Sequence, residues 1–209
     1  MAVWRCNRPS LATLRGLWHG PFMTALLDVP QIRERFSPIS VAEYHQLGEF
    51  NENGRRTELI RGIILEKMSK SPLHYAMIER LRKILAGQIQ PGFVLRQEGP
   101  LTMKDSEPEP DLAIVQGSEE DFFAAHPVTA ELAIEVAVTS LEIDRIKAEI
   151  YAEAGVKEYW IVCPVEKRVE IYRQPKGRAY VEQLAISAPG ALECRAATGV
   201  RVDLQALFA

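Results

Sequence analysis

The sequence predicts a mixed α/β (α+β) fold with one central mixed β-sheet flanked by helices. Two segments, 71–88 and 139–155, carry the apolar spacing of amphipathic helices. Short apolar or alternating segments typical of strands lie between and after them. No internal repeat is found, so these elements indicate one sheet with helices packed on it.

Length and composition are those of an ordinary globular protein. The 209 residues are 47% hydrophobic and 25% charged, which suits one domain with a modest extension. We expect residues 1–35 to be a poorly ordered N-terminal extension and residues 36–209 to be the domain. The first 27 residues contain arginines but no acidic residue, which also fits a transit peptide, and Met23 is an alternative start.

Cysteine usage and hydropathy exclude several classes. No apolar run reaches the ~18 residues of a membrane span. Three cysteines without C-x-x-C spacing argue against a disulfide framework and a zinc ribbon, so we expect a reducing, cytoplasmic compartment. The net charge of −3 is unlike that of a strong non-specific nucleic-acid binder.

The first elements follow from capping and turn signals. Ser40 and Glu43 form a capping box, and Gly48 is expected to end the short helix that it begins. Ser71 and Pro72 have the N-cap and first-turn preferences that begin the first long helix. The expected ranges are helix 41–47, strands 57–60 and 63–67 about a turn, helix 72–88, and strand 93–97.

The second half begins with apolar strands and a second long helix. A capping box at 139–142 begins that helix, and Gly155 ends it. Its inward face is expected to be the apolar stripe of Ile143, Ile146, Ile150 and Ala154. The other expected ranges are strands 112–115, 131–138, 159–163, 168–173 and 180–186, a surface helix at 118–125, a turn at 175–177, strand 200–204 closing the sheet, and a last helical turn to Phe208.

Three polar residues depart from these patterns. Asp111 follows a proline at the start of a buried strand, Glu135 lies mid-strand between apolar neighbours, and Lys147 lies beside the apolar stripe. Each has an ordinary alternative: a turn aspartate, a solvent-facing strand residue, and a helix lysine paired with Asp144. A buried glutamate would need a partner, because an unpaired buried charge is costly.

Taken together, the three residues match one chemistry. Two carboxylates on adjacent strands can hold Mg²⁺, which lowers the pKa of bound water and neutralises phosphodiester charge. A nearby lysine can offset the developing negative charge. The four histidines lack zinc-site spacing, and neither a phosphate-binding glycine loop nor a G-x-S-x-G elbow occurs.

Several motifs resemble one family. The chain resembles the Uma-two family of bacterial endonucleases, within the PD-(D/E)xK restriction-endonuclease-like superfamily, from about residue 39 to the C-terminus. The motifs that carry the resemblance are E-L-I-R-G at 58–62, S-P-L-H at 71–74, E-P-D-L at 109–112, I-E-V at 134–136, D-R-x-K at 144–147, and A-G-V-x-E-Y-W-I-V at 154–162.

The resemblance implies a restriction-endonuclease-like core and a site. It implies Asp111, Glu135 and Val136 as metal ligands for Mg²⁺ or Mn²⁺. The superfamily keeps its lysine two residues after the glutamate, where this chain has Ala137, and the family places it at Lys147. Glu58 matches an early family glutamate that would contact metal or water, with a surface glutamate as an equal alternative.

Three further positions can be compared with the family pattern. His74 matches a recurrent family histidine, for which we favour local packing or capping. Arg61 and Cys163 stand where the family more often has aspartate.

These observations lead to three hypotheses. The first is a Mg²⁺-dependent DNA endonuclease acting as a homodimer, because a duplex has two strands to cut. The second is a non-catalytic nucleic-acid-binding or regulatory module that retains the fold. The third is a nuclease for RNA or a branched intermediate. Nucleic-acid contacts would come from local basic clusters at 55–61 and 80–83, and would weaken with salt.

Overall fold

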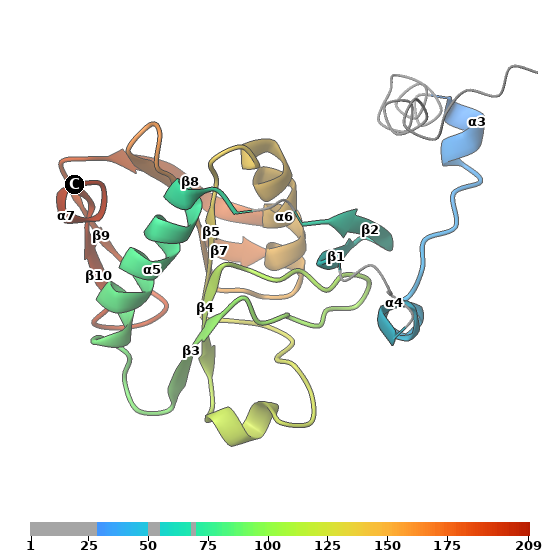
Figure 1. Ribbon diagram of the computed structural model, residues 1–209, viewed down its shortest axis with the longest axis horizontal. Coiled ribbons are helices and arrows are strands. Elements are labelled where there is room, and N and C mark those ends of the chain that lie inside the picture. The colour runs from blue at the N-terminus through green and yellow to red at the C-terminus, as the bar shows by residue number, and fades with distance from the viewer. Residues whose placement is uncertain (1–28, 50–54, 68–69) are drawn as a thin grey trace, which may run out of the picture. The chain divides into compact units, whose positions relative to one another are not determined.

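The computed structural model describes residues 29–49, 55–67 and 70–209 (Figure 1). Its contacts divide the chain into two units, residues 1–38 and 39–209. The described part of the first unit contains helix α3 (Pro30–Arg33). The expectation of a poorly ordered N-terminus concerns mainly residues 1–28, which lie outside the described residues.

The second unit is built on a mixed sheet with the strand order β3-β4-β5-β6-β7-β8. Strands β5 and β6 pair in parallel, and the other neighbours pair antiparallel. This confirms the mixed α+β fold with a central sheet. The strands are β3 Phe93–Gln97, β4 Leu112–Gln116, β5 Leu132–Val136, β6 Glu158–Cys163, β7 Arg168–Lys176 and β8 Ala179–Ser187.

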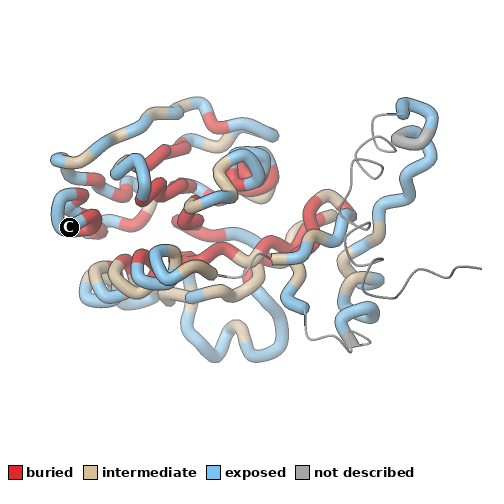
Figure 2. Tube along the Cα trace, turned by 45° about the horizontal axis from the view of Figure 1, so that its top comes forward, coloured by how far each residue is buried: buried red, intermediate tan, exposed pale blue. Residues whose placement is uncertain are grey.

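Helices cover both faces of this sheet (Figure 1). Helix α5 (Pro72–Ala86) packs Leu81 and its apolar neighbours on one face, together with Leu132 and Ile134 of β5. Helix α6 (Leu141–Glu153) packs on the other face, together with Ala133 and Ala137. Strands β5 and β6 are therefore buried on both faces, and burial is concentrated on the central strands (Figure 2).

β1 (Thr57–Ile60) and β2 (Ile63–Glu66) form an antiparallel hairpin, and β1 carries Glu58. Arg61 and Gly62 both have positive φ, of 52° and 75°, as the two central residues of a type I′ turn require. Helix α4 (Val41–Glu49) precedes the hairpin and runs past Gly48, which was expected to end it. The short turn η1 (Glu119–Phe122) replaces the surface helix expected at 118–125.

The strand expected to close the central sheet does not join it. Strand β10 (Arg201–Asp203) pairs with β9 (Ala191–Glu193) in a separate small sheet, followed by α7 (Leu204–Leu207). Val202 and Leu192 pack in the same apolar cluster as α5. The segment therefore covers a face of the main sheet instead of extending its edge.

Another correction concerns Pro175, which was expected in a turn. Strand β7 continues through Pro175 to Lys176, and the turn follows at 177–178. The ladder between β7 and β6 ends at Arg173, so the missing N–H of Pro175 breaks no hydrogen bond on that side.

The inward face of α6 is also different from the expected one. Ile143 and Ile146 of the predicted stripe are 42% and 61% exposed, whereas Asp144, Lys147 and Tyr151 are buried. The N-cap of α6 is Ser140, one residue after the first residue of the predicted capping box, and its hydroxyl donates to Asp144 instead of capping a backbone N–H. The polar face of α6 can turn inward because its charges are neutralised there by one another and by neighbouring strands.

No helix in the described part of the chain is long and apolar enough to cross a membrane.

Candidate active site

A cavity of about 150 Å³ lies where β1, the start of β4, the end of β5 and the first turns of α5 and α6 meet. Its lining includes every predicted site residue and two further polar residues whose side chains contact them. These residues are Glu58, His74, Asp111, Glu135, Val136, Asp144 and Lys147. The topology thus brings together residues separated by up to 89 positions (58 to 147).

Asp111 is held through one of its oxygens, by a hydrogen bond and by a contact with a histidine. Its Oδ2 accepts the backbone N–H of Val136 at 2.8 Å and lies 3.2 Å from His74 Nε2. No described residue donates to Oδ1, and this oxygen is not sealed from solvent. The carboxylate is therefore oriented through one oxygen and presents the other to the cavity.

Glu135 is arranged in a similar way. Its Oε1 accepts hydrogen bonds from Lys147 Nζ at 3.1 Å and from the Tyr151 hydroxyl at 3.0 Å. No donor among the described residues reaches Oε2, which also is not sealed from solvent. The alternative of a solvent-facing strand residue is wrong, since Glu135 is only 5% exposed. Burial raises the pKa of its carboxyl group to about 8.

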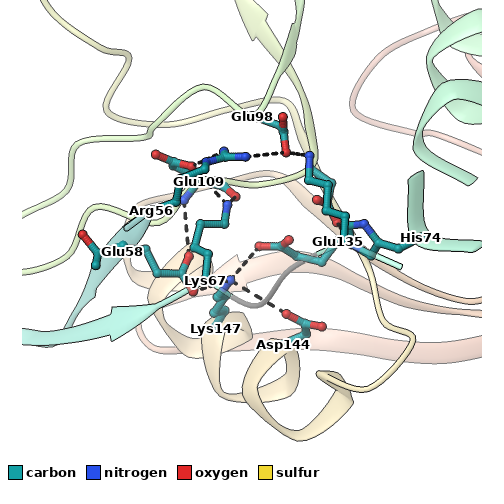
Figure 3. A network of polar contacts seen from close by, with 12 residues as sticks. Arg56, Glu58, Lys67, His74, Glu98, Glu109, Glu135, Asp144 and Lys147 are labelled. Atoms are coloured by element: carbon teal, nitrogen blue, oxygen red, sulfur yellow. Dashed lines mark hydrogen bonds and ion pairs between the residues drawn. The ribbon is translucent and has the colours of Figure 1, made fainter. Parts of the chain in front are cut away.

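Lys147 lies among carboxylates, as Figure 3 shows. Its ammonium is 2.9 Å from Glu58 Oε1, 3.1 Å from Glu135 Oε1 and 3.8 Å from Asp144 Oδ1. Burial by itself would lower the pKa of Lys147, but the charges of Glu135, Glu58 and Asp144 outweigh it and raise the pKa. The lysine therefore stays charged at neutral pH and acts as a fixed cation.

Glu58 and Asp144 hold this lysine from opposite sides (Figure 3). Glu58 is buried, so the alternative of a surface glutamate is wrong. Asp144, considered in the sequence only as a helix partner of Lys147, accepts the Ser140 hydroxyl at 2.6 Å. The spacing of Asp144, Lys147 and Tyr151 is that of one helix face, and this was the signal for an inward polar face.

His74 is a second residue that sequence reasoning undervalued. Its backbone N–H is accepted by Ser71 Oγ, as the N-cap pattern indicated, but its side chain reaches the Asp111 carboxylate. The preference for purely local packing or capping was therefore wrong. The Nδ1 atom of His74 is buried without a hydrogen-bond partner in the described structure, so only Nε2 serves the site.

The donor set fits a hard divalent cation held at an open site. Five carboxyl groups and three lysines line the cavity, so negative charge remains in excess even when Glu135 holds a proton, and a cation would neutralise it. Among the described residues, no group of three or more His, Cys, Asp or Glu side chains is placed to hold a metal ion. Mg²⁺ does not require three protein side chains, since one or two carboxylates with water and substrate phosphate usually hold it.

A family model and a solved structure both match this chain. A model of the Uma2 family, described as "Putative restriction endonuclease", matches residues 41–205. The chain is also similar in structure to a protein from Anabaena variabilis described as "a putative nuclease belonging to DUF820", with a TM-score of 0.68 and 19% sequence identity. That similarity covers 82% of this chain and 98% of the other, and shows a shared fold. No curated protein matches the chain.

Proposed function

This chain belongs to the Uma2 family of restriction-endonuclease-like proteins, and on that premise we propose that it is a Mg²⁺-dependent endonuclease that hydrolyses phosphodiester bonds in DNA. The family and the nuclease-like fold support a hydrolase.

One observation carries it. Asp111 and Glu135 each bind protein donors through one oxygen and leave the other available in the same cavity. Carboxylates restrained in this way lose little conformational freedom when they bind a cation. We assign Asp111 Oδ1 and Glu135 Oε2 to Mg²⁺, or to Mn²⁺. Val136 offers only its backbone carbonyl, because its N–H is already donated to Asp111.

The cation would supply charge neutralisation at the phosphate and a bound water of lowered pKa. Lys147 contributes a second, permanent positive charge beside Glu135, and it can donate a hydrogen bond to the attacking water or to the phosphate. It cannot act as a base, since its pKa lies above its ordinary value. Glu58 and Asp144 fix the ammonium in place, and His74 fixes Asp111.

A cleavage assay tests the proposal. Supercoiled plasmid and labelled oligonucleotides are incubated with Mg²⁺ or Mn²⁺ and wild-type protein, Asp111→Asn or Lys147→Met. We expect cleavage by the wild type and a loss of at least ~10²-fold in either variant. Glu131→Gln is a matched control, because Glu131 is a buried, lysine-paired carboxylate outside the cavity. Cleavage that survives in both site variants, or that is absent over a broad DNA and RNA panel, would contradict the proposal.

The alternative is a non-catalytic nucleic-acid-binding or regulatory module with the same fold. It is favoured by the net charge of −3, because a strong grip on DNA usually needs a basic surface. Binding without cleavage in the same assay would select it, and cleavage of RNA alone would select the third hypothesis. Two features remain expectations: a homodimer, which sedimentation would test, and a reducing cytoplasm, with which the buried free thiols of Cys163 and Cys194 agree.

A further inference from the structure

Two lysines of the cavity lining and a nearby arginine share two carboxylates. Lys67 and Lys70 line the cavity beyond the end of β2, and Arg56 directly precedes β1. They meet Glu98, which follows β3, and Glu109, which lies two residues before Asp111 (Figure 3). We refer to these three basic residues as the basic rim.

Both carboxylates are shared between two cations. Glu109 Oε2 lies 2.9 Å from Arg56 Nη2 and 3.1 Å from Lys67 Nζ. Glu98 Oε1 lies 3.3 Å from Arg56 Nη1 and also pairs with Lys70 Nζ. Three cations thus meet two anions, so the basic rim has one positive charge in excess beside a cavity that is otherwise acidic.

Other basic residues proposed from the sequence are engaged elsewhere. Arg61 pairs with Asp105 and Glu153. Arg80 donates to backbone carbonyls of the C-terminal segment, and Arg82 pairs with Glu79. Arg55 pairs with Glu66 of the cavity lining. The basic rim thus contributes two lysines to the lining, where a nucleic-acid backbone would have to pass to place a phosphodiester in the site.

We propose that the basic rim binds the DNA phosphates next to the scissile bond. In the free protein, Glu98 and Glu109 occupy the positions of those phosphates. This inference rests on the proposed phosphodiester chemistry. A carboxylate oxygen shared by two cations resembles a phosphate oxygen in charge and hydrogen bonding. Substrate binding then exchanges carboxylates for phosphates. This exchange lowers affinity, because the rim cations must leave existing partners, and it excludes weakly charged ligands from the acidic cavity.

Fluorescence anisotropy with a labelled DNA duplex tests the inference in EDTA, where binding is measured without cleavage. The proteins compared are wild type, Lys67→Ala/Lys70→Ala and Glu98→Gln, with Lys176→Ala as the control for loss of an exposed lysine far along the sequence. The double variant should weaken binding ~10-fold or more and reduce the salt slope by about 1 to 2. Glu98→Gln should tighten binding ~3-fold or more, because it removes a competing anion.

The opposite directions of these effects separate binding from structure. If the network only stabilises the fold, Glu98→Gln and the double variant both lower the melting temperature and neither tightens binding. That result overturns the inference, as does a double variant with wild-type affinity and salt slope, or a wild type that binds no DNA. If the wild type cleaves DNA but the rim variants bind DNA as the wild type does, the inference about the basic rim is wrong and the proposed endonuclease stands. If the double variant binds DNA more weakly and Glu98→Gln binds it more tightly, but no protein cleaves DNA, the proposed endonuclease is wrong and the inference about the basic rim stands.

Discussion

The Asp111 carboxylate accepts a 2.8 Å hydrogen bond from the backbone N–H of Val136, the residue directly after Glu135. This bond ties the start of β4 to the end of β5, where the two strands pair antiparallel. Because both candidate metal ligands adjoin it, displacing either strand end would separate their free oxygens.

The first prediction concerns the metal. Mg²⁺ binding only to the folded protein should raise the melting temperature of the wild type in a concentration-dependent way. Asp111→Asn should abolish most of that rise while leaving the metal-free melting temperature unchanged or higher, because it removes one of the crowded carboxylates. Differential scanning calorimetry with and without Mg²⁺ measures both. An equal rise in the variant would argue against Asp111 as a ligand.

The second prediction concerns Lys147. Lys147→Met should destabilise the protein by about 3 to 5 kcal/mol, because the buried carboxyl groups of Glu58, Glu135 and Asp144 would lose the ammonium that pairs with them. Adding Glu135→Gln to this variant should restore part of the loss. Urea unfolding at pH 7 measures the free energy of unfolding. A double variant less stable than Lys147→Met would contradict the assignment of mutual neutralisation.

The third prediction treats His74 as a positioning residue. His74→Ala removes one of the two groups that contact Asp111 Oδ2, so Mg²⁺ affinity should fall about 10-fold, within the usual range for residues that orient ligands. His74→Gln should recover part of the affinity, since its amide can donate to the carboxylate. Calorimetric titration gives the affinities, and unchanged Mg²⁺ binding by His74→Ala would remove this role.

The fourth prediction uses Glu170, which lies outside the cavity. Arg145 donates to both of its oxygens, at 2.6 and 3.0 Å, and with Arg168 and Tyr172 holds its pKa at about 2 instead of 4.5. A lowered folded-state pKa contributes stability above pH 4.5 that disappears as the pH falls through 2. Glu170→Gln should therefore cost about 2 kcal/mol at pH 7, and progressively less below pH 4.5. A pH-independent cost in urea unfolding would refute the assignment.

The fifth prediction tests the orientation of α6. Ile146→Ala should change the free energy of unfolding by less than about 0.5 kcal/mol, because this side chain is 61% exposed. Ile150→Ala should cost about 2 to 4 kcal/mol, because Ile150 is buried. Similar costs for the two variants would mean that the predicted apolar stripe faces inward after all.

Local signals were sufficient for most elements. Ser71 and Pro72 began α5, and the apolar run at 159–163 lies within β6, since caps and burial patterns depend on residues close in sequence. The partner of 200–204 was misjudged, because an alternating pattern shows that a strand has a buried side but does not identify its neighbour. Membership of the Uma2 family could likewise be predicted from short motifs in the sequence.

By itself, the sequence determined the fold class, the family, and the candidacy of Asp111, Glu135 and Lys147. Only the tertiary structure decided which way α6 turns, that His74 reaches Asp111, and that Asp144 and Glu58 hold the lysine. The physical reason is that a charged side chain stays in water unless the interior offers it oppositely charged or hydrogen-bonding groups. Those groups lie on strands and helices distant in sequence. Hydrophobic periodicity reflects the preference of each residue for water or for the apolar interior. Interaction partners that only the fold brings close can outweigh that preference.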